Sequence, residues 1–368
     1  MSDRYETNQV DTYQSQGIGG RTKSAVVAGT LAAAGIGFAA SLIWPQLRRG
    51  KALDNRFLDL KGKKVVITGG SRGLGLQLAR EFGREGARVF ICARDREELE
   101  QAKADLEKRG IRADVFVCDV TNRLSVDAMI SEVEINYGPI DVLVNNAGVI
   151  QVSPVENLEV GDYEEAMKVM FWGTLYPALA VLPSMVERRM GTICNITSIG
   201  GKVGIPHMAP YCAAKFAATG WSESVAAELR GKGVNIVTVI PGLMRTGSHR
   251  NAKFKGDEEK EFRWFSLGAT LPGLAMNPQR ASKEIVEAVK SGVSHRILSV
   301  PANVLTRAHG LMPEVTARLL SIANDTLLPS RGRSYEAVSG QDAERRLDSK
   351  LHRAITGIAP KEELNQPA

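Results

Sequence analysis

The residues of this chain whose types and spacing best suit catalysis are Ser198, Tyr211 and Lys215. Tyr211 and Lys215 have the i, i+4 spacing that places two side chains on one face of a helix. A neighbouring ammonium stabilises phenolate, so we expect the pKa of Tyr211 to fall from about 10 toward the working pH. Such a phenol exchanges protons with a carbonyl or alcohol oxygen, which a nearby serine hydroxyl can hold. The same pair on a solvated helix face would have no catalytic role, so the rest of the chain must decide.

A glycine-rich turn lies far upstream of these residues. Residues 63–68 read as a strand and residues 76–82 as a helix, with the turn between them. Glycines allow the backbone to approach a pyrophosphate closely, and the following helix N-terminus offers free N–H groups to that anion. The pattern predicts a dinucleotide site, against the alternative of an ordinary strand-to-helix turn.

Two arginines bear on which dinucleotide binds. The strand predicted at Arg88–Ala93 ends beside Arg94, where a site for NAD usually has an acidic residue. Arg72 lies inside the glycine turn. Cations at these places suit a 2′-phosphate, so NADP(H) is favoured over NAD(H), although either arginine can also be a solvated surface residue.

Strand-like and helix-like stretches alternate along the chain. This order, with strands that are apolar throughout, predicts an α/β fold with a parallel sheet covered on both faces. Further strands are expected at 113–118, 141–144, 192–196, 234–240 and 296–300, and helices near 95–109, 122–137, 159–190, 208–230 and 281–291. Polar residues follow several strand ends, where ligands bind in such sheets. These residues are Thr68, Arg94, Asp119, Asn145, Ser198 and Pro241.

The ordered motifs resemble those of the short-chain dehydrogenase/reductase family over roughly residues 60–300. The matches are the TGxxxGxG turn at 68–75, Asp119-Val120, the NNAG motif at 145–148, Ser198 with the YxxxK motif at 211–215, and Pro241-Gly242 with Thr246. The resemblance implies a Rossmann-type doubly wound parallel sheet of about seven strands. It also implies a homodimer or homotetramer.

The resemblance assigns roles to individual residues. Tyr211 is the expected acid/base, Lys215 lowers its pKa and binds the nicotinamide ribose, and Ser198 orients the substrate oxygen. Thr197 is a weaker candidate for that hydroxyl. The implied cofactor contacts are Thr68, Gly69, Ser71, Arg72, Gly73, Leu74, Gly75, Arg94, Asp119, Val120, Asn145, Ala147, Gly148, Tyr211, Lys215, Pro241, Gly242 and Thr246.

One position departs from the family pattern. Met170 stands where the family usually has an asparagine that helps hold a water linking the lysine to solvent. Methionine cannot donate a hydrogen bond. The departure puts the proton relay in doubt, but not cofactor binding.

The segment from Ala25 to Trp44 contains no charged residue. About 20 such residues match the thickness of a bilayer core, so we expect one membrane anchor with the catalytic domain on the cytoplasmic side. A cleaved signal peptide and a soluble core helix are the alternatives. The expected order is a polar segment at 1–24, a transmembrane helix at 25–44, a linker at 45–59 and the catalytic domain at 60–300.

The region beyond the Pro241-Gly242 motif is apolar. Residues 243–277 contain several aromatic side chains and correspond to the family's substrate lid. These aromatic side chains suggest a lipophilic ligand or, alternatively, helices that pack on the domain. Residues 301–330 read as an apolar helical extension that docks on the core or lies at a membrane surface, and 331–368 as a polar, disordered tail.

Composition narrows the range of functions. The 368 residues carry a formal net charge of +6 and hold four cysteines without a CxxC or other ligand pattern. We therefore expect no metal site and reduced thiols. No stretch has the interleaved aromatic and basic residues that indicate nucleic-acid binding.

Together these patterns predict a membrane-tethered oxidoreductase of lipid metabolism. The expected reaction is NADPH-dependent reduction of a ketone or aldehyde on a lipophilic molecule, with Tyr211 as proton donor. Candidate substrates are a keto-acyl chain, a long-chain keto-base, a steroid-like ketone or a retinal-like aldehyde. The alternatives are an NAD(P)-dependent alcohol dehydrogenase working oxidatively, and a nucleotide-binding scaffold with little turnover.

Overall fold

The computed structural model describes residues 58–271 and 273–347. The predicted polar segment at 1–24, the transmembrane helix at 25–44 and most of the linker at 45–59 lie outside the described residues. The end of the predicted tail, from residue 348, lies outside them as well.

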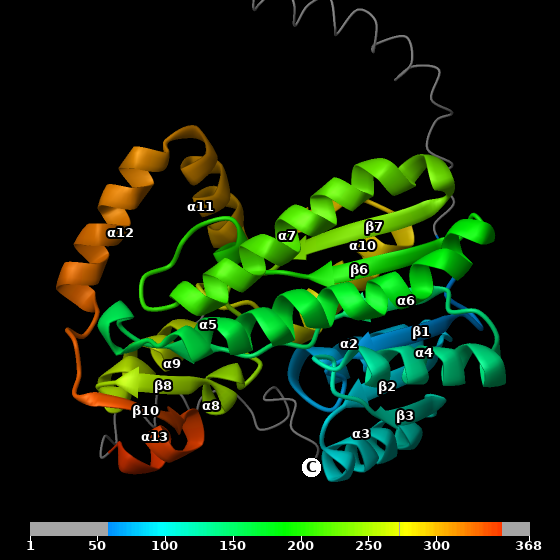
Figure 1. Cartoon of the computed structure of the whole chain (residues 1–368), viewed down its shortest axis with the longest axis horizontal. Coiled ribbons are helices and arrows are strands. Elements are labelled where there is room, and N and C mark those ends of the chain that lie inside the picture. The colour runs from blue at the N-terminus through cyan, green and yellow to red at the C-terminus, as the bar shows by residue number, and fades with distance from the viewer. Residues whose placement is uncertain (1–57, 272, 348–368) are drawn as a thin grey trace, which may run out of the picture. The chain divides into compact units, whose positions relative to one another are not determined.

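A seven-stranded sheet forms the centre of the domain, in the order β3-β2-β1-β4-β6-β7-β9 (Figure 1). Every neighbouring pair in it is parallel, as predicted. The strands are β1 (Lys64–Thr68), β2 (Arg88–Ala93), β3 (Ala113–Val117), β4 (Val142–Asn145), β6 (Gly191–Ile196), β7 (Val234–Ile240) and β9 (His295–Ile297). The order reverses between β1 and β4, the switch point where ligands of such sheets bind.

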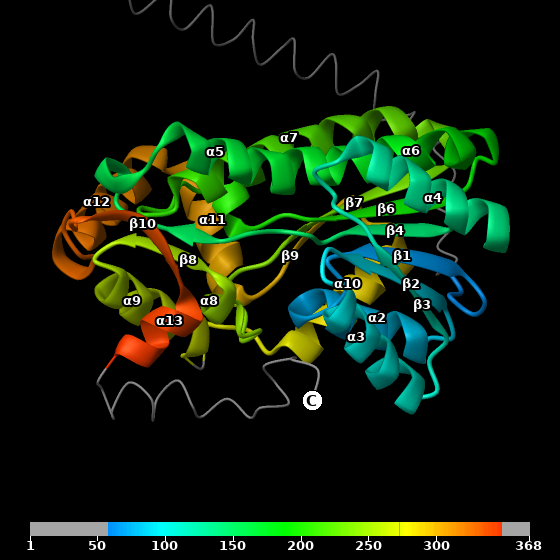
Figure 2. The same ribbon diagram turned by 60° about the horizontal axis from the view of Figure 1, so that its bottom comes forward.

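Helices cover both faces of this sheet (Figure 2). On one face lie α2 (Gly73–Arg84), α3 (Arg96–Lys108) and α10 (Pro278–Ser291), which share an apolar core with the strands. On the other lie α4 (Arg123–Tyr137), α6 (Gly173–Glu187) and α7 (Ala209–Leu229), with a second core. Strands buried on both sides explain the continuous apolar runs in the sequence.

One helical stretch among the described residues, Val160–Glu187, is long and apolar enough to cross a membrane by length and composition. It comprises α5 (Val160–Met167), a π-helical turn (Lys168–Trp172) and α6. Because α6 buries Ala178, Val181 and Met185 in the core on the sheet, this stretch is a covering helix of the domain.

The region predicted as a substrate lid folds into α8 (Ser248–Asn251), β8 (Lys253–Gly256) and α9 (Glu258–Thr270). Its strand β8 forms the centre of a second sheet. β8 pairs in parallel with β5 (Gln151–Val152) and antiparallel with β10 (Ser334–Ser339).

The C-terminal extension is helical, as predicted for residues 301–330. It contains α11 (Val300–Leu311) and α12 (Pro313–Leu327). The prediction of a disordered tail from residue 331 is wrong for its first part, because β10 and α13 (Gly340–Arg346) are ordered. The reason is pairing: β10 completes the edge of β8, a partner that is distant in the sequence.

Candidate active site

The glycine turn between β1 and α2 has the backbone shape that a phosphate cradle requires. Gly69 has a φ of +65°, which favours glycine. A Cβ added at Gly75 would lie 2.0 Å from the carbonyl oxygen of Gly69, so a side chain there would fill the turn. Helix α2 begins at Gly73 without a side-chain cap on its N–H groups. The turn therefore fits the pyrophosphate of a dinucleotide, with Thr68, Ser71 and Leu74 at its edges.

Asn146 holds this turn in place. Its Nδ2 donates to the carbonyl oxygens of Thr68 and Gly69, both at 3.1 Å. The backbone N–H groups of Asn146 and Ala147 donate to the Thr68 hydroxyl at 3.0 and 3.1 Å. The predicted contact set contains Asn145, Ala147 and Gly148 but omits Asn146. The sequence shows that Asn146 belongs to the NNAG motif, but it does not show that Asn146 binds Thr68 and Gly69.

A buried chain of polar side chains fixes Asn145. Its Nδ2 donates to Asn195 Oδ1 at 2.9 Å, and Asn195 Nδ2 donates to Ser222 Oγ at 2.9 Å. Ser222 shares a 2.7 Å hydrogen bond with Thr238. Asn145 Oδ1 is buried and has no hydrogen-bond partner among the described residues. Sequence reasoning missed Asn195, Ser222 and Thr238; the available signal was polar residues in apolar strands and on the covering helix.

Arg72 does not stand free at the predicted 2′-phosphate position. Its guanidinium donates to Glu98 Oε1 at 2.6 Å, and the Ser71 hydroxyl donates to Glu98 Oε2 at 3.0 Å. Arg94, at the end of β2, is exposed and has no ion-pair partner among the described residues. Glu98 is a second residue that sequence reasoning missed, because it lies one turn into a charged helix without a motif of its own.

Asp119 and Val120 follow β3 as predicted. One carboxylate oxygen of Asp119 accepts hydrogen bonds from the backbone N–H and the hydroxyl of Thr121, both at 2.9 Å. Val120 is buried against Gly173, where an added Cβ would lie 2.8 Å from it. The pair forms the wall beyond the glycine turn on which the family's adenine contact is expected.

The structure brings the three predicted catalytic residues together. Ser198 follows β6, and its Oγ accepts a hydrogen bond from Gly200 N at 3.1 Å. Gly200 in turn lies against the Tyr211 ring, since a Cβ added at Gly200 would lie 3.1 Å from Cε1 of that ring, and Ser198 is near enough to Tyr211 to lower its pKa. Lys215 Nζ lies 5.9 Å from the centre of the Tyr211 ring and donates to Ile196 O at 2.9 Å. A phenol, a hydroxyl and an amine thus meet at the carboxyl end of the sheet.

The expected fall in the pKa of Tyr211 is wrong for the protein chain alone. Burial raises the pKa of Tyr211 to about 12, although the nearby Ser198 side chain opposes that rise. Burial also lowers the pKa of Lys215 to about 8. Desolvation disfavours both charged forms and is the largest cause of both shifts. Tyr211 therefore holds its proton at neutral pH.

Thr197 does not take the role of Ser198. Its hydroxyl donates to Val239 O at 2.9 Å, and its N–H donates to the same carbonyl at 2.8 Å. Both polar groups of Thr197 are thus turned to β7 and hold the sheet together.

Met170 occupies the π-helical turn between α5 and α6 and is 1% exposed. A Cβ added at Gly148 would lie 3.8 Å from Met170 Cγ and 3.9 Å from Lys215 Nζ, so both side chains border one point. Met170 also packs with Ala214 and Tyr211. A thioether therefore stands beside the catalytic lysine, where the family pattern has an amide.

The segment after β7 approaches the catalytic serine. Pro241 O accepts a hydrogen bond from Ile199 N at 2.8 Å, which ties the two strand ends together. Thr246, further along the same loop, is buried, and its N–H donates to Met244 O at 2.9 Å. With Gly242, these residues line the approach from the catalytic serine toward the lid.

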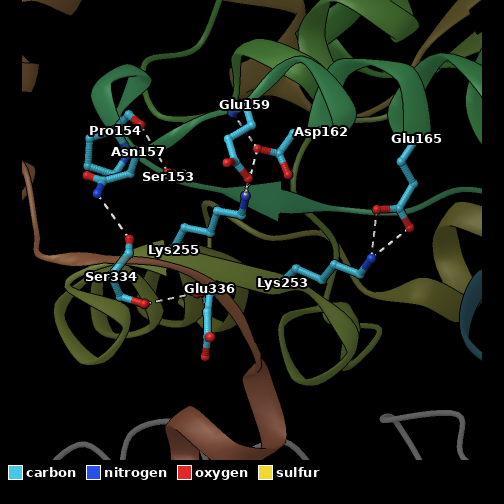
Figure 3. Close-up of polar contacts among 10 residues, drawn as sticks. All are labelled: Ser153, Pro154, Asn157, Glu159, Asp162, Glu165, Lys253, Lys255, Ser334 and Glu336. Atoms are coloured by element: carbon cyan, nitrogen blue, oxygen red, sulfur yellow. Dashed lines mark hydrogen bonds and ion pairs between the residues drawn. The ribbon is translucent and has the colours of Figure 1, made fainter.

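Ion pairs fasten the lid strand to α5 (Figure 3). Lys255 is 5% exposed, and its Nζ lies 2.9 Å from Asp162 Oδ2 and 3.3 Å from Glu159 Oε2. Lys253 Nζ lies 2.7 Å from both carboxylate oxygens of Glu165. Two alternate positions of β8, which lie on the same face of the strand, thus hold one helix.

The lid is also held by His207, and Asn157 holds the segment that leads into β10. His207 Nδ1 lies 2.8 Å from Glu261 Oε1, and Trp264 Nε1 donates to Glu261 Oε2 at 2.6 Å. Asn157 Nδ2 donates to the carbonyl oxygens of Gly332 and Ser334, both at 3.0 Å. Figure 3 shows the hydrogen bond to Ser334. Sequence reasoning missed the contacts of His207 and Asn157 because they join segments that are distant along the chain.

A cavity of about 10 Å³ lies beside Tyr211, about the room that one water molecule needs. It is lined by Val149, Ile150, Gln151, Glu165, Ala166, Met170, Tyr211 and Lys253. The walls are mainly apolar, and the Lys253–Glu165 pair supplies the charged side. Any carbonyl substrate requires these side chains to move apart.

The aromatic lid residues pack on the domain. Phe254, Phe262 and Phe265 are buried in one cluster that also contains Met208 and Cys212. Their rings meet edge to face, with centroids 5.5 and 6.0 Å apart for the two pairs that include Phe254. Of the two interpretations of this aromatic segment, packing on the domain describes these three side chains.

All four cysteines lie among the described residues and are free and buried, in agreement with the expected reduced thiols. The described part of the chain contains no cluster of three or more side chains suited to a metal.

Comparison with known proteins agrees with this geometry. Residues 63–256 match the family model described as short chain dehydrogenase. The 2-(S)-hydroxypropyl-CoM dehydrogenase 3 of Xanthobacter autotrophicus is 39% identical over 185 residues, which cover 50% of this chain and 72% of that protein. The 3-ketodihydrosphingosine reductase of Bos taurus is 33% identical over 240 residues, which cover 64% of this chain and 70% of that protein.

A solved structure is also similar. A variant of actinorhodin polyketide ketoreductase with NADPH superposes with a TM-score of 0.57 at 30% identity. The superposition covers 65% of this chain and 95% of that one.

Proposed function

The chain belongs to the short-chain dehydrogenase/reductase family, whose members act on CH–OH and C=O groups with a nicotinamide cofactor. From that premise we propose that the protein is an NADPH-dependent reductase of a ketone or aldehyde on a lipophilic molecule. One observation carries the proposal. A proton-holding Tyr211 lies near Ser198 and buried Lys215, on the wall of a small, mainly apolar cavity.

The proton on Tyr211 supports the reductive direction. Because burial raises the pKa of Tyr211 to about 12, the phenol keeps its proton at neutral pH and is ready to donate it to a carbonyl oxygen. When bound, the nicotinamide supplies the hydride that reduces the carbonyl carbon. Ser198 holds the substrate oxygen, and the Lys215 ammonium stabilises the phenolate that remains after proton donation.

The preference for NADP(H) is supported by Arg94, which is exposed at the end of β2. Arg72 contributes if its pair with Glu98 opens toward a 2′-phosphate. The similar ketoreductase structure contains NADPH, which agrees with this preference.

A lipophilic substrate is supported by the apolar cavity walls formed by Val149, Ile150, Ala166 and Met170. The 3-ketodihydrosphingosine reductase of Bos taurus makes a long-chain keto compound a reasonable class to test. We also propose, from the sequence, a single membrane anchor at 25–44 with the catalytic domain in the cytoplasm, and a homodimer or homotetramer.

Tyr211→Phe tests the proposal. The change removes the proton donor and keeps the ring, so reduction of a ketone by NADPH should fall by about 10²- to 10⁴-fold while NADPH binding, followed by fluorescence, is retained. Thr197→Val is a matched control, because Thr197 faces β7, and it should keep most of its activity. Full activity in Tyr211→Phe would contradict the role of Tyr211 as proton donor, whereas absence of turnover in the unaltered chain with NADPH still bound would favour a scaffold role.

The related 2-(S)-hydroxypropyl-CoM dehydrogenase keeps the oxidative direction open as a second candidate. The same assay run with alcohols and with NADP or NAD separates the two. A faster oxidation with NAD than reduction with NADPH, under equal driving force, would overturn both the direction and the cofactor preference.

A further inference from the structure

His207 and Glu261 form a buried polar contact that has no part in the proposed proton and hydride transfers. The side chain of Glu261 is 0% exposed and that of His207 is 8% exposed. Glu261 Oε1 lies 2.8 Å from His207 Nδ1, and Glu261 Oε2 accepts a hydrogen bond from Trp264 Nε1 at 2.6 Å. Burial of a carboxylate is costly unless it is hydrogen-bonded, and here both of its oxygens have a partner.

The two residues lie on two different sides of the active site. His207 belongs to the loop between Ser198 and Tyr211. Its carbonyl oxygen accepts a hydrogen bond from Ser153 N at 2.8 Å. Glu261 lies in the first turn of the lid helix α9. The contact therefore joins the lid to the segment that connects two catalytic residues.

The backbone of His207 has an unusual conformation. Its φ is +62°, in the left-handed region, which is uncommon for residues other than glycine. Such conformations persist where surrounding contacts hold them, and they cluster at active sites and ligand clamps. At His207 these contacts are the hydrogen bond from Ser153 to the backbone and Glu261 on the ring. The conformation supports a functional contact in preference to incidental packing.

The lid helix brings aromatic side chains close to Tyr211. Trp264 and Phe265 of α9 pack in the apolar cluster that also includes Tyr211 and Met208. The rings of His207 and Trp264 meet edge to face, with their centroids 6.3 Å apart. The contact with Glu261 thus fixes the part of α9 that packs beside the catalytic tyrosine.

A ketone can reach Tyr211 only if the lid moves. The cavity beside Tyr211 has room for about one water molecule, and lid residue Lys253 forms part of its wall. The next residue of β8, Phe254, packs on Phe262 and Phe265 of α9. Strand β8 and α9 lie side by side in both views (Figures 1 and 2). A movement that enlarges the cavity therefore also displaces α9.

We propose that His207 and Glu261 are positioning residues that clamp the lid closed beside Tyr211, so that a ketone enters when their contact opens and is enclosed when it forms again. The inference rests on the proposed reductase function and adds the device that closes its site. Closure keeps water away from the phenol and the carbonyl during proton and hydride transfer. The two residues act through the position of α9 and exchange no proton with the ketone.

Removal of the clamp should weaken ketone binding without slowing the bound complex. Glu261→Leu takes the acceptor away from His207 and Trp264. His207→Gly removes the ring and suits the positive φ. With methyl nonyl ketone as the probe and saturating NADPH, each variant should raise KM about tenfold, because the closed lid becomes a minor state. The kcat value should change less than about twofold, and NADPH affinity should be unchanged.

Conservative variants separate this contact from general packing. Glu261→Gln keeps an oxygen acceptor, and His207→Asn keeps a nitrogen donor in a residue that tolerates positive φ, so both should return KM to within about threefold of the unaltered chain. Glu259→Leu is the matched control, because it removes an exposed carboxylate from the same turn of α9, and it should leave KM unchanged. The double variant His207→Gly/Glu261→Leu should match either single variant, since all three lose one contact.

Hydrogen exchange follows the clamp without turnover. In the NADPH-bound full-length chain, the backbone amides of α9 should exchange about tenfold faster in Glu261→Leu than in the unaltered protein. The amides of α4 serve as the internal reference and should not change.

Three outcomes would overturn the clamp. The first is an unchanged KM with unchanged exchange of α9 in Glu261→Leu. The second is a set of single effects on KM that add in the double variant, because the two residues would then act separately. The third is a loss of kcat at constant KM, which would place the residues in the chemistry. Absence of ketone reduction by the unaltered chain would refute the proposed function, and hydrogen exchange would still decide whether the contact holds the lid.

Discussion

The cofactor region and the lid region are both closely packed, but only the cofactor region is marked by short sequence motifs. The turn at 68–75 is held by a glycine motif and by Asn146, a residue of another short motif. The lid strand β8 is held by β10 and by ion pairs to α5. No short sequence motif predicts the strand pairing or the ion pairs. Local backbone requirements leave a local signature, whereas pairing between distant segments does not.

Equal steric changes in the two regions should therefore have different functional results. Gly75→Ala would place a Cβ 2.0 Å from Gly69 O, which displaces the phosphate cradle. We expect cofactor affinity to fall at least 100-fold, since the nearest contacting atom belongs to the backbone of Gly69 and cannot move aside as a flexible side chain would. Measurement of NADPH binding by fluorescence titration checks this expectation.

The matching change in the lid region is Gly332→Ala, whose Cβ would lie 2.0 Å from the backbone of Gly256. This variant should keep the NADPH affinity of the wild type and raise KM for the ketone about tenfold or more, because β8 moves away from the cavity. Loss of cofactor affinity in Gly332→Ala would show that the two regions are not separable.

Lys255→Met removes the buried cation that joins β8 to α5. Its removal leaves Asp162 without that partner, so the free energy of unfolding should drop by about 3 kcal/mol. Lys253→Met is the control, because both partners of its ion pair are about half exposed, and it should cost less than about 1 kcal/mol. Urea unfolding of the two variants measures the difference, and equal losses would contradict the assigned burial.

Buried Lys215 should make stability depend on pH in a definite direction. Burial lowers its pKa from 10.5 to about 8, so the folded state disfavours the ammonium form. The cost, about 3 kcal/mol, is present in full below pH ~8 and is relieved as the pH rises toward 10.5, since the unfolded chain then binds more protons. In Lys215→Met this rise in stability with pH should be absent. Urea unfolding at pH 7 and pH 10 compares the two chains, and parallel pH profiles would rule out the buried amine.

The sequence predicted the parallel sheet, the glycine turn and the meeting of Ser198, Tyr211 and Lys215, because each depends on periodicity or on residues at strand ends. It did not predict the pKa of Tyr211, since a pair of charges can be read from spacing but burial cannot. It also missed β10, whose polar composition resembles a tail and whose order comes from the edge of β8. Met170 lies between these cases: the sequence identified the substitution, and the structure added that the thioether borders Lys215.

The smallest expected effect concerns Glu98, a residue of the cofactor region that the sequence did not predict. Glu98 accepts hydrogen bonds from Ser71 and Arg72, and its charge opposes a 2′-phosphate at the same arginine. Glu98→Gln removes that charge and should raise the preference for NADPH over NADH by about two- to fivefold, as expected for a half-exposed pair. Glu97→Gln is the control: it removes an equal charge from the same turn of α3, at an exposed residue with no ion-pair partner among the described residues. If both variants change the ratio of kcat/KM values equally, the effect is one of net charge, and Arg94 alone must carry the preference.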